Sequence, residues 1–153
     1  MNGPLSFQES TKKDLSHLIA LLQDDDLGST REDISDLASY EKAFKFILED
    51  PLHQILILKT GDEIIGCTQL SFLPNLTFKG GWRAQLEGVR INSKFRGQGF
   101  GKQLIREAIN RSKQFGCHLV QFTTNSARPK SILFYEKLGF KSTHTGMKLY
   151  LDP

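Results

Sequence analysis

A glycine-rich segment with flanking positive charge, FRGQGFGKQL at residues 95–104, opens a stretch with helical periodicity. Each glycine inside a helix costs about 1 kcal/mol relative to alanine, and the turn contains no Ser, Thr, Asp or Asn that could cap the helix. The first four N–H groups of a helix lack internal partners, and the helix dipole favours an anion beside them. The segment therefore predicts a phosphate or pyrophosphate site, with a ligand-free glycine turn as the alternative. The residues concerned are Arg96, Gly97, Gln98, Gly99, Phe100, Gly101 and Lys102.

The spacing of the glycines excludes two common nucleotide-binding motifs. A P-loop requires Ser or Thr after its lysine, whereas Gln103 follows Lys102 here. A dinucleotide fingerprint requires GxGxxG, whereas this segment has GxGxG. Nucleic-acid binders interleave aromatic and basic residues, but only Phe95 and Phe100 are aromatic in this segment, and Phe100 has the spacing of a core residue. We therefore expect a small phosphate-containing ligand and no nucleic acid.

The glycine segment lies between stretches with the alternating pattern of strands and stretches with the periodicity of helices, and these elements must position it. Strands are expected at residues 4–10, 53–59, 63–72, 84–91 and 118–124, with one or two more in 140–151. Helices are expected from Ser10 or Thr11 to Leu22, from Leu37 to just before Pro51, from the glycine segment to Gly116, and over 128–138. This order predicts an α/β or α+β layer architecture with a mixed sheet, in one domain over residues 1–153. Gly88, inside the fourth of these strands, predicts a β-bulge or a close backbone approach.

The composition is that of an ordinary globular protein, with 153 residues of which 39% are hydrophobic and 24% charged. No stretch approaches the ~20 apolar residues of a membrane-spanning helix, and the first ten residues lack the pattern of a signal peptide. Cys67 and Cys117 form no CxxC pair, which indicates a reducing compartment. We therefore expect a cytoplasmic protein. The four histidines have no metal-ligand spacing, and no metal is expected.

Charge is distributed unevenly along the chain. Residues 1–78 contain 13 Asp and Glu against 6 Lys and Arg, whereas residues 79–130 contain 11 Lys and Arg against 2 Asp and Glu. Such a division suggests an acidic region that faces a cation and a basic region that faces an anion. Two solvated faces of opposite charge are the alternative.

The hexapeptide RGQGFG at residues 96–101 resembles the R/Q-x-x-G-x-G/A motif of the GNAT superfamily of acyl-CoA N-acyltransferases. SILFYEKLGF at residues 131–140 resembles the fourth helix of that family, with its tyrosine and closing Gly-Phe in place. The resemblance covers essentially the whole chain. It implies a single domain with a mixed, mostly antiparallel central sheet, splayed parallel strands 4 and 5, and four flanking helices.

The resemblance further implies that the chain is an acetyl-CoA-dependent N-acetyltransferase, with acetyl-CoA between the two splayed strands. The pyrophosphate would then lie on the N–H groups of residues 97–102. The pantetheine arm would pair, like an added strand, with the backbone of Val89, Arg90 and Ile91. The acceptor would be a primary amine of a small molecule, and a homodimer would be possible.

Two side chains take catalytic roles by this resemblance. Tyr135 occupies the position of the family's general acid, and a phenol with an ordinary pKa of about 10 stays protonated at pH 7 and can donate to the leaving thiolate. Glu87, in the strand before the glycine segment, could accept the amine proton directly or through water, or hold the ammonium ion. A structural carboxylate is the equal alternative for Glu87. For Tyr135 the lesser alternative is a helix tyrosine that packs beside Phe134.

One stretch departs from the common family pattern. Many members carry Asn seven residues before the tyrosine and Ala four before it, whereas this chain has Arg128 and Ser131. Asn125 precedes them, and we expect Asn125 and Ser131 to contact the cofactor. The pattern TTNSARPKSILFY is more similar to a subgroup that includes aminoalkylphosphonate N-acetyltransferases. Arg128 could then meet a phosphate of CoA or an anionic group of the substrate, since arginine suits bidentate oxyanion contacts.

Other functions remain open at this point. A protein lysine or N-terminus is the alternative acceptor, a non-catalytic acyl-CoA-binding module would need no acid, and nucleic acid could bind the basic middle of the chain. The acidic run Asp24, Asp25 and Asp26 lies in the loop that, in this family, forms one wall of the acceptor site. It could attract a cationic amine or lie in a solvated loop.

Overall fold

The computed structural model describes residues 3–151, which divide into two compact units, one that ends at Gln121 and one that begins at Phe122. The strands of the first unit are β1 (Leu5–Glu9), β2 (His53–Thr60), β3 (Glu63–Leu73), β4 (Trp82–Ile91) and β5 (Cys117–Gln121). Its helices are α1 (Leu15–Gln23), α2 (Ala38–Glu49), α3 (Thr77–Gly80) and α4 (Phe100–Phe115), with short 3-10 turns η1 (Lys12–Asp14), η2 (Gly28–Thr30) and η3 (Ser93–Phe95). The second unit contains α5 (Pro129–Glu136).

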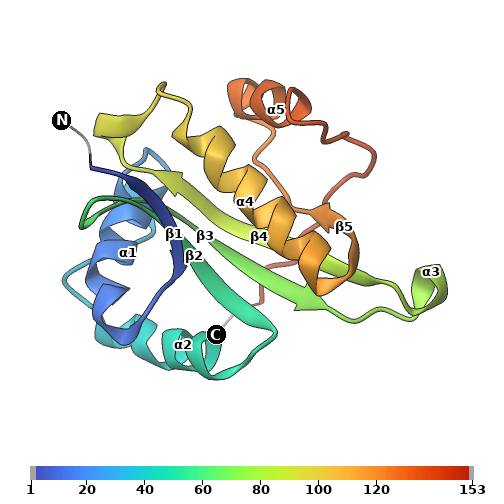
Figure 1. Cartoon of the computed structure of the whole chain (residues 1–153), viewed down its shortest axis with the longest axis horizontal. Coiled ribbons are helices and arrows are strands. Elements are labelled where there is room, and N and C mark those ends of the chain that lie inside the picture. Colours follow the sequence, from blue (N-terminus) through green and yellow to red (C-terminus); the bar gives the residue numbers. More distant parts are fainter. Residues whose placement is uncertain (1–2, 152–153) are drawn as a thin grey trace. The chain divides into compact units, whose positions relative to one another are not determined.

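The five strands form one sheet in the order β1-β2-β3-β4-β5 (Figure 1). The first three pairings are antiparallel, and β4 pairs with β5 in parallel. The predicted mixed, mostly antiparallel sheet is therefore confirmed. No helix among residues 3–151 has the length and apolar character needed to cross a bilayer.

Helices cover the two faces of this sheet. Leu18 and Leu21 of α1 and Phe44 of α2 pack with Ile57 and Cys67 in one buried cluster. Neighbouring residues of a strand point to opposite faces, so Leu56 and Leu58 face the other side, where α4 lies. The side of α4 that carries Leu104, Ile105 and Ala108 is fully buried. Burial of these two apolar layers holds β4, and the segment that follows it, in place.

The expected bulge lies at Gly88. Gln69 pairs with Glu87 and Cys67 with Arg90, so two residues of β4 oppose one of β3. Gly88 has φ +60°, a left-handed conformation that suits glycine. The bulge prediction is confirmed, and the bulge shifts which residues of β4 share a face beyond this point.

β4 and β5 separate after a short ladder. Their pairing ends at Gln85 opposite Gln121, whereas β4 continues to Ile91. Among residues 3–151, the last part of β4 therefore has a strand partner on the β3 side only. This is the splay that the family resemblance implied.

Two expectations about elements were wrong. No strand is assigned within residues 140–151, although the alternating apolar residues there predicted one or two. The side chains of Met147, Leu149, Tyr150 and Leu151 are 82–93% exposed, so nothing in the described chain supplies the packing that an amphipathic strand needs. A fifth helical segment, α3, is added to the four expected, and it is a single turn in which Phe78 and Lys79 have left-handed backbone angles.

Candidate active site

The glycine segment forms an exposed turn that leads into α4. Gly97 and Gly99 have φ +76° and +85°, and a Cβ added at either would meet no atom within 4 Å. Glycine is therefore needed for the backbone conformation, and the space beside the turn is open. Gly99 is the N-cap of α4, and no side chain caps the helix.

The backbone donors of this turn lack protein acceptors. Within residues 3–151, the N–H groups of residues 97–102 donate no hydrogen bond to another part of the chain. Unpaired amides at the positive end of a helix suit an anion with several oxygens. The turn therefore fits the pyrophosphate of an acyl-CoA.

The guanidinium of Arg96 already has partners within the first unit. Its Nε donates to the Ile91 carbonyl at 2.9 Å, and its Nη2 contacts the carbonyl and the carboxylate of Asp24. Lys102, in the first turn of α4, is exposed, and no ion pair of its ammonium is found within residues 3–151. Of the two expected flanking cations, Lys102 is the one available to an anion.

Glu87 lies on the exposed face of β4, next to the bulge. Its carboxylate accepts a hydrogen bond from Gln85 Nε2 at 3.0 Å, and its backbone carbonyl accepts one from Thr68 Oγ1 at 3.0 Å. Glu87 is exposed, so a substrate amine or a bridging water can reach its carboxylate.

The three residues expected along the pantetheine follow the bulge. Val89, Arg90 and Ile91 are half-buried and lie on the part of β4 that β5 does not pair. The Arg90 side chain turns away to an ion pair, with Nε 3.3 Å from Asp25 Oδ2 and no aligned hydrogen bond at that nitrogen. The backbone of these residues, rather than the Arg90 side chain, is what remains for an added strand.

Tyr135 belongs to an aromatic cluster within the second unit. Its ring centroid lies 4.2 Å from that of Phe122, 5.0 Å from Phe134 and 5.9 Å from Phe140. Ring packing of this kind fixes the direction of the phenol, as a proton donor requires.

The two other expected contacts of the second unit precede Tyr135. Asn125 Oδ1 accepts from the backbone N–H of Ala127 at 2.9 Å, so its side chain shapes the turn before α5. Ser131 is half-buried in the first turn of α5, with its backbone N–H on the Arg128 carbonyl at 3.0 Å. The first unit thus brings together Glu87, the end of β4 and the glycine segment. The second unit contains Asn125, Ser131 and Tyr135.

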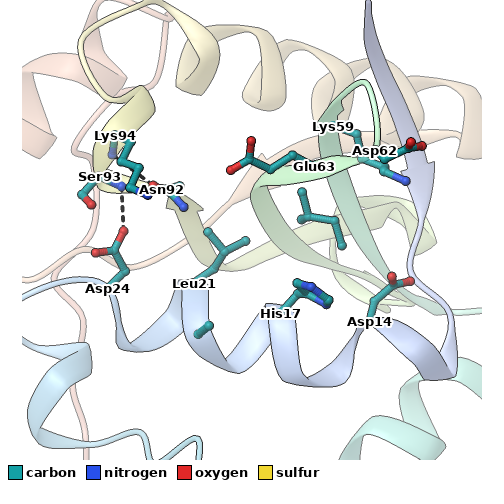
Figure 2. Close-up of a pocket in the computed structure, with 12 residues that line it drawn as sticks. Asp14, His17, Leu21, Asp24, Lys59, Asp62, Glu63, Asn92, Ser93 and Lys94 are labelled. Carbon is teal, nitrogen blue, oxygen red and sulfur yellow. Dashed lines mark hydrogen bonds between the residues drawn. The ribbon is translucent and has the colours of Figure 1, made fainter. Parts of the chain in front are cut away.

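A cavity of about 590 Å³ lies between α1, the β2–β3 turn and η3 (Figure 2). Figure 2 shows Glu63 between Lys59 and Asp62 on one side and Lys94 on the other, with His17 below. Neither Glu87 nor Tyr135 lines it. Within residues 3–151 no group of three or more His, Cys, Asp or Glu side chains is arranged to hold a metal ion.

Sequence reasoning missed the structural role of the acidic run. Asp24 binds η3 and Arg96, and Asp25 binds Arg90 and the backbone N–H of Gly28. Only the run of three carboxylates was visible in the sequence, and its partners Arg90, Ser93 and Arg96 lie 65 to 72 residues further along the chain. The remaining member, Asp26, is exposed.

Comparison with known proteins agrees with this geometry. Residues 17–140 match the Acetyltransferase (GNAT) family. A glucosamine 6-phosphate N-acetyltransferase of Trypanosoma brucei brucei is 35% identical over 88 residues, which are 58% of each chain, so this chain spans less than two thirds of that relative. An aminoalkylphosphonate N-acetyltransferase of Salmonella typhimurium (strain LT2) is 29% identical over 110 residues, 71% of this chain and 70% of the relative.

A solved structure reported as a transcriptional regulator from Bacillus halodurans C-125 has the same fold. Its TM-score is 0.93 at 44% identity, and the match covers 97% of this chain and 100% of the other. The family match includes both the glycine segment and Tyr135. The chain therefore belongs to the acetyltransferase (GNAT) family, whose members depend on acetyl-CoA, as the resemblance of residues 96–101 and 131–140 implied.

Proposed function

We propose that this protein transfers the acetyl group of acetyl-CoA to a primary amine of a small molecule. The observation that carries the proposal is the run of six amides at residues 97–102 with no acceptor in the described chain, next to a stretch of β4 that no described strand pairs on one side. An acyl-CoA has a pyrophosphate for the amides and an amide-containing arm for the strand. The match to the family, residues 17–140, spans both units and supports one N-acetyltransferase domain over residues 1–153.

Separate parts of the first unit are proposed to contact separate parts of acetyl-CoA. The pyrophosphate accepts hydrogen bonds from the glycine segment and is paired with Lys102, while the pantetheine arm adds to the open side of β4. In the second unit, Asn125 and Ser131 are proposed to contact the cofactor. The residues proposed to bind the donor, or to hold its binding segment in place, are Val89, Arg90, Ile91, Arg96, Gly97, Gln98, Gly99, Phe100, Gly101, Lys102, Asn125 and Ser131.

Chemistry follows in a complex of both substrates. The neutral amine nitrogen attacks the thioester carbonyl carbon, the C–N bond forms, and the C–S bond breaks. Tyr135 gives its hydroxyl proton to the leaving thiolate, and Glu87 takes the proton that the amine loses, directly or through water. The exposed carboxylate of Glu87 suits this task, and the packed ring of Tyr135 suits the task of an aimed donor.

A small amine that also carries a phosphate or phosphonate is the proposed acceptor. Two relatives are named for such amines, a glucosamine 6-phosphate and an aminoalkylphosphonate N-acetyltransferase. Arg128, at the start of α5, is proposed to meet the anionic group, because a guanidinium binds two oxyanion oxygens at once.

Acceptor-stimulated release of free CoA tests this proposal. Purified protein with acetyl-CoA is offered glucosamine 6-phosphate, glucosamine, an aminoalkylphosphonate, the matching plain alkylamine, an aminoglycoside and a lysine peptide. We expect the phosphorylated or phosphonylated amines to stimulate CoA release at least about tenfold more than the matching amines that lack the anionic group, the gain of one charged contact. Preference for the peptide would assign a protein acceptor. Tight CoA binding without release by any amine would indicate a non-catalytic module.

Nucleic-acid binding is the second candidate, because the similar Bacillus halodurans structure is reported as a transcriptional regulator and residues 79–130 are strongly basic. Binding through that charge predicts an affinity for DNA that falls steeply as salt rises. Competition by CoA for the same surface would mark the DNA binding as incidental.

We also propose that the protein pairs as a homodimer. Met147, Leu149, Tyr150 and Leu151 are exposed, and β5 ends the sheet with one neighbouring strand. The apolar segment of one copy can therefore cover that of a second copy, or pair with its sheet edge.

A further inference from the structure

A carboxylate of the α1–η2 loop binds the connection between β4 and the glycine segment. Asp24 Oδ2 accepts a hydrogen bond from the backbone N–H of Ser93 at 2.6 Å, drawn as a dashed line in Figure 2. The Arg96 guanidinium bonds the Asp24 carbonyl and lies 3.4 Å from Oδ2. The same guanidinium holds the Ile91 carbonyl at 2.9 Å, so Asp24, Arg96 and the end of β4 are linked.

These bonds hold both ends of η3. Ser93 is the first residue of η3 and Arg96 is its C-cap, directly before Gly97. Asn92 Oδ1 accepts from the Lys94 N–H at 3.0 Å, and Gln98 Nε2 donates to the Lys94 carbonyl at 3.2 Å. The short connection therefore has a single arrangement, which sets the direction in which the following amides point.

A second contact fixes the loop that carries Asp24. The adjacent Asp25 pairs with Arg90 of β4 and accepts from the Gly28 N–H at 2.6 Å. The Asp25 and Arg90 side chains are 9% and 13% exposed, so this contact anchors the loop in the interior. The Asp24–Arg96 pair, by contrast, is 35% and 46% exposed and contributes little to folding stability by itself.

We propose that Asp24 is a positioning residue for acetyl-CoA, and that Arg96 acts with it as a clamp on η3 rather than as an independent phosphate ligand. The inference rests on the proposed placement of the pyrophosphate on residues 97–102. Pre-ordering the amides removes an entropic cost that CoA binding would otherwise carry. Asp24 does this from outside the binding site, through Ser93 and Arg96.

Charge and geometry predict opposite effects on CoA affinity when the Asp24 carboxylate is removed. A carboxylate close to an anion site repels CoA, so its removal should tighten CoA binding if charge alone matters. If the clamp matters, its removal should weaken CoA binding although a negative charge is lost. The neighbouring Asp26 is exposed and offers the same charge without these contacts.

Calorimetric titration with CoA compares Asp24→Ala, Asp24→Asn and Asp26→Ala with the unsubstituted protein. We expect Asp24→Ala to raise the Kd about 3- to 10-fold, the size of one lost hydrogen bond. Asp24→Asn keeps an oxygen acceptor for the Ser93 N–H and should recover part of that loss. Asp26→Ala should leave the Kd within about twofold, since it removes only charge. Thermal melting verifies that each variant is folded, and Asp24→Asn decides the matter if the alanine variant does not fold.

A double-substitution cycle separates the clamp from a phosphate ligand. If the two residues act as one clamp, Asp24→Ala and Arg96→Gln each raise the Kd for CoA. In the Asp24→Ala protein, Arg96→Gln then raises the Kd by less than about a further twofold. The KM for acetyl-CoA rises while kcat stays within about twofold, because the residues order the donor site before chemistry begins. Two results would overturn the clamp and leave the proposed function intact. One is a double variant in which the two single effects on the Kd multiply, and the other is CoA binding by Asp24→Ala as tight as that of the unsubstituted protein. Absence of CoA binding by the unsubstituted protein would overturn both.

Discussion

Tyr135 is the residue at which the proposed chemistry can be tested with least disturbance. Its ring packs against Phe122 and Phe140, and phenylalanine keeps that packing while it removes the hydroxyl. We expect Tyr135→Phe to lower kcat about 100-fold or more, the usual range for a lost general acid. The Kd for CoA should change less than about twofold, because the proposed donor contacts do not use the phenol.

Tyr150→Phe provides the matched control, since it also removes only a tyrosine hydroxyl and Tyr150 is none of the proposed catalytic or donor-binding residues. Steady-state rates and CoA titrations of both variants give the comparison. A Tyr135→Phe variant that turns over like the control would remove Tyr135 from the mechanism.

Cys67 differs from Cys117 in how far the fold suppresses its ionisation. Burial raises the pKa of Cys67 to about 12, against the opposing charge of Arg90, and burial also raises the pKa of Cys117. The folded state therefore favours the neutral Cys67 thiol. This contribution to stability is complete below the unfolded pKa near 9 and is lost as pH rises toward 12.

Alkylation at pH 8 tests this difference. In a Cys117→Ser variant, we expect iodoacetamide to label Cys67 at least about 100-fold more slowly in the folded protein than in denaturant. Cys117, which is half-buried, should react in the folded protein of a Cys67→Ser variant. Rapid labelling of folded Cys117→Ser would contradict the burial of Cys67.

At the scale of elements, α4 begins and ends on glycines with the same backbone conformation. Gly99 has φ +85° and Gly116 has φ +94°, and an added Cβ meets nothing within 4 Å at either. Alanine at each position should therefore cost about 1–2 kcal/mol of stability through backbone strain alone. Only Gly99→Ala should also weaken CoA binding, because it disturbs the amides at the N-terminus of the helix.

Chemical denaturation and CoA titration of the two variants make the comparison. Gly116→Ala controls for the loss of stability, since it lies at the opposite end of α4. Equal CoA affinity in the two variants would show that the glycine segment is a turn without a role in binding.

Local signals in the sequence predicted most elements of the first unit. The change from helical to alternating periodicity placed β2, β3 and α4, and Gly88 predicted the bulge that the register of β3 and β4 confirms. The missing cap before α4 predicted its open N-terminus. Each of these signals depends on neighbours within a few residues.

Contacts between distant residues could not be predicted in the same way. Asp24 and Ser93 are 69 positions apart, and nothing in either local sequence specifies the other. Arg96 was expected at the phosphate, but its guanidinium is engaged with Asp24 and Ile91. Local pattern identifies which side chains are charged, whereas the fold decides which of them are neutralised.

At the scale of the whole molecule, the C-terminal segment has apolar side chains that nothing in the described chain covers. Met147, Leu149, Tyr150 and Leu151 are 82–93% exposed, although their alternation predicted a strand. If a second copy covers them, the protein should elute as a particle of about twice its 17.3 kDa. Aspartate at both Met147 and Leu149 should convert it to a monomer, because charge on an apolar interface is costly to bury.

Light scattering after size exclusion measures this mass. Leu76→Asp is the control, since Leu76 is 97% exposed and lies in the first unit. A monomeric unsubstituted protein, or a Leu76→Asp variant that dissociates as readily as the double aspartate variant, would contradict pairing through the C-terminal segment.

The central claim is that acetyl-CoA is held by the backbone amides that lead into α4. Amide proton and nitrogen chemical shifts, recorded during titration of the isotopically labelled protein with CoA, report on each N–H directly. The account predicts that the largest downfield shifts occur at residues 97–102, because those donors gain phosphate acceptors. Saturation of the protein with CoA while these six amides stay unchanged would contradict it.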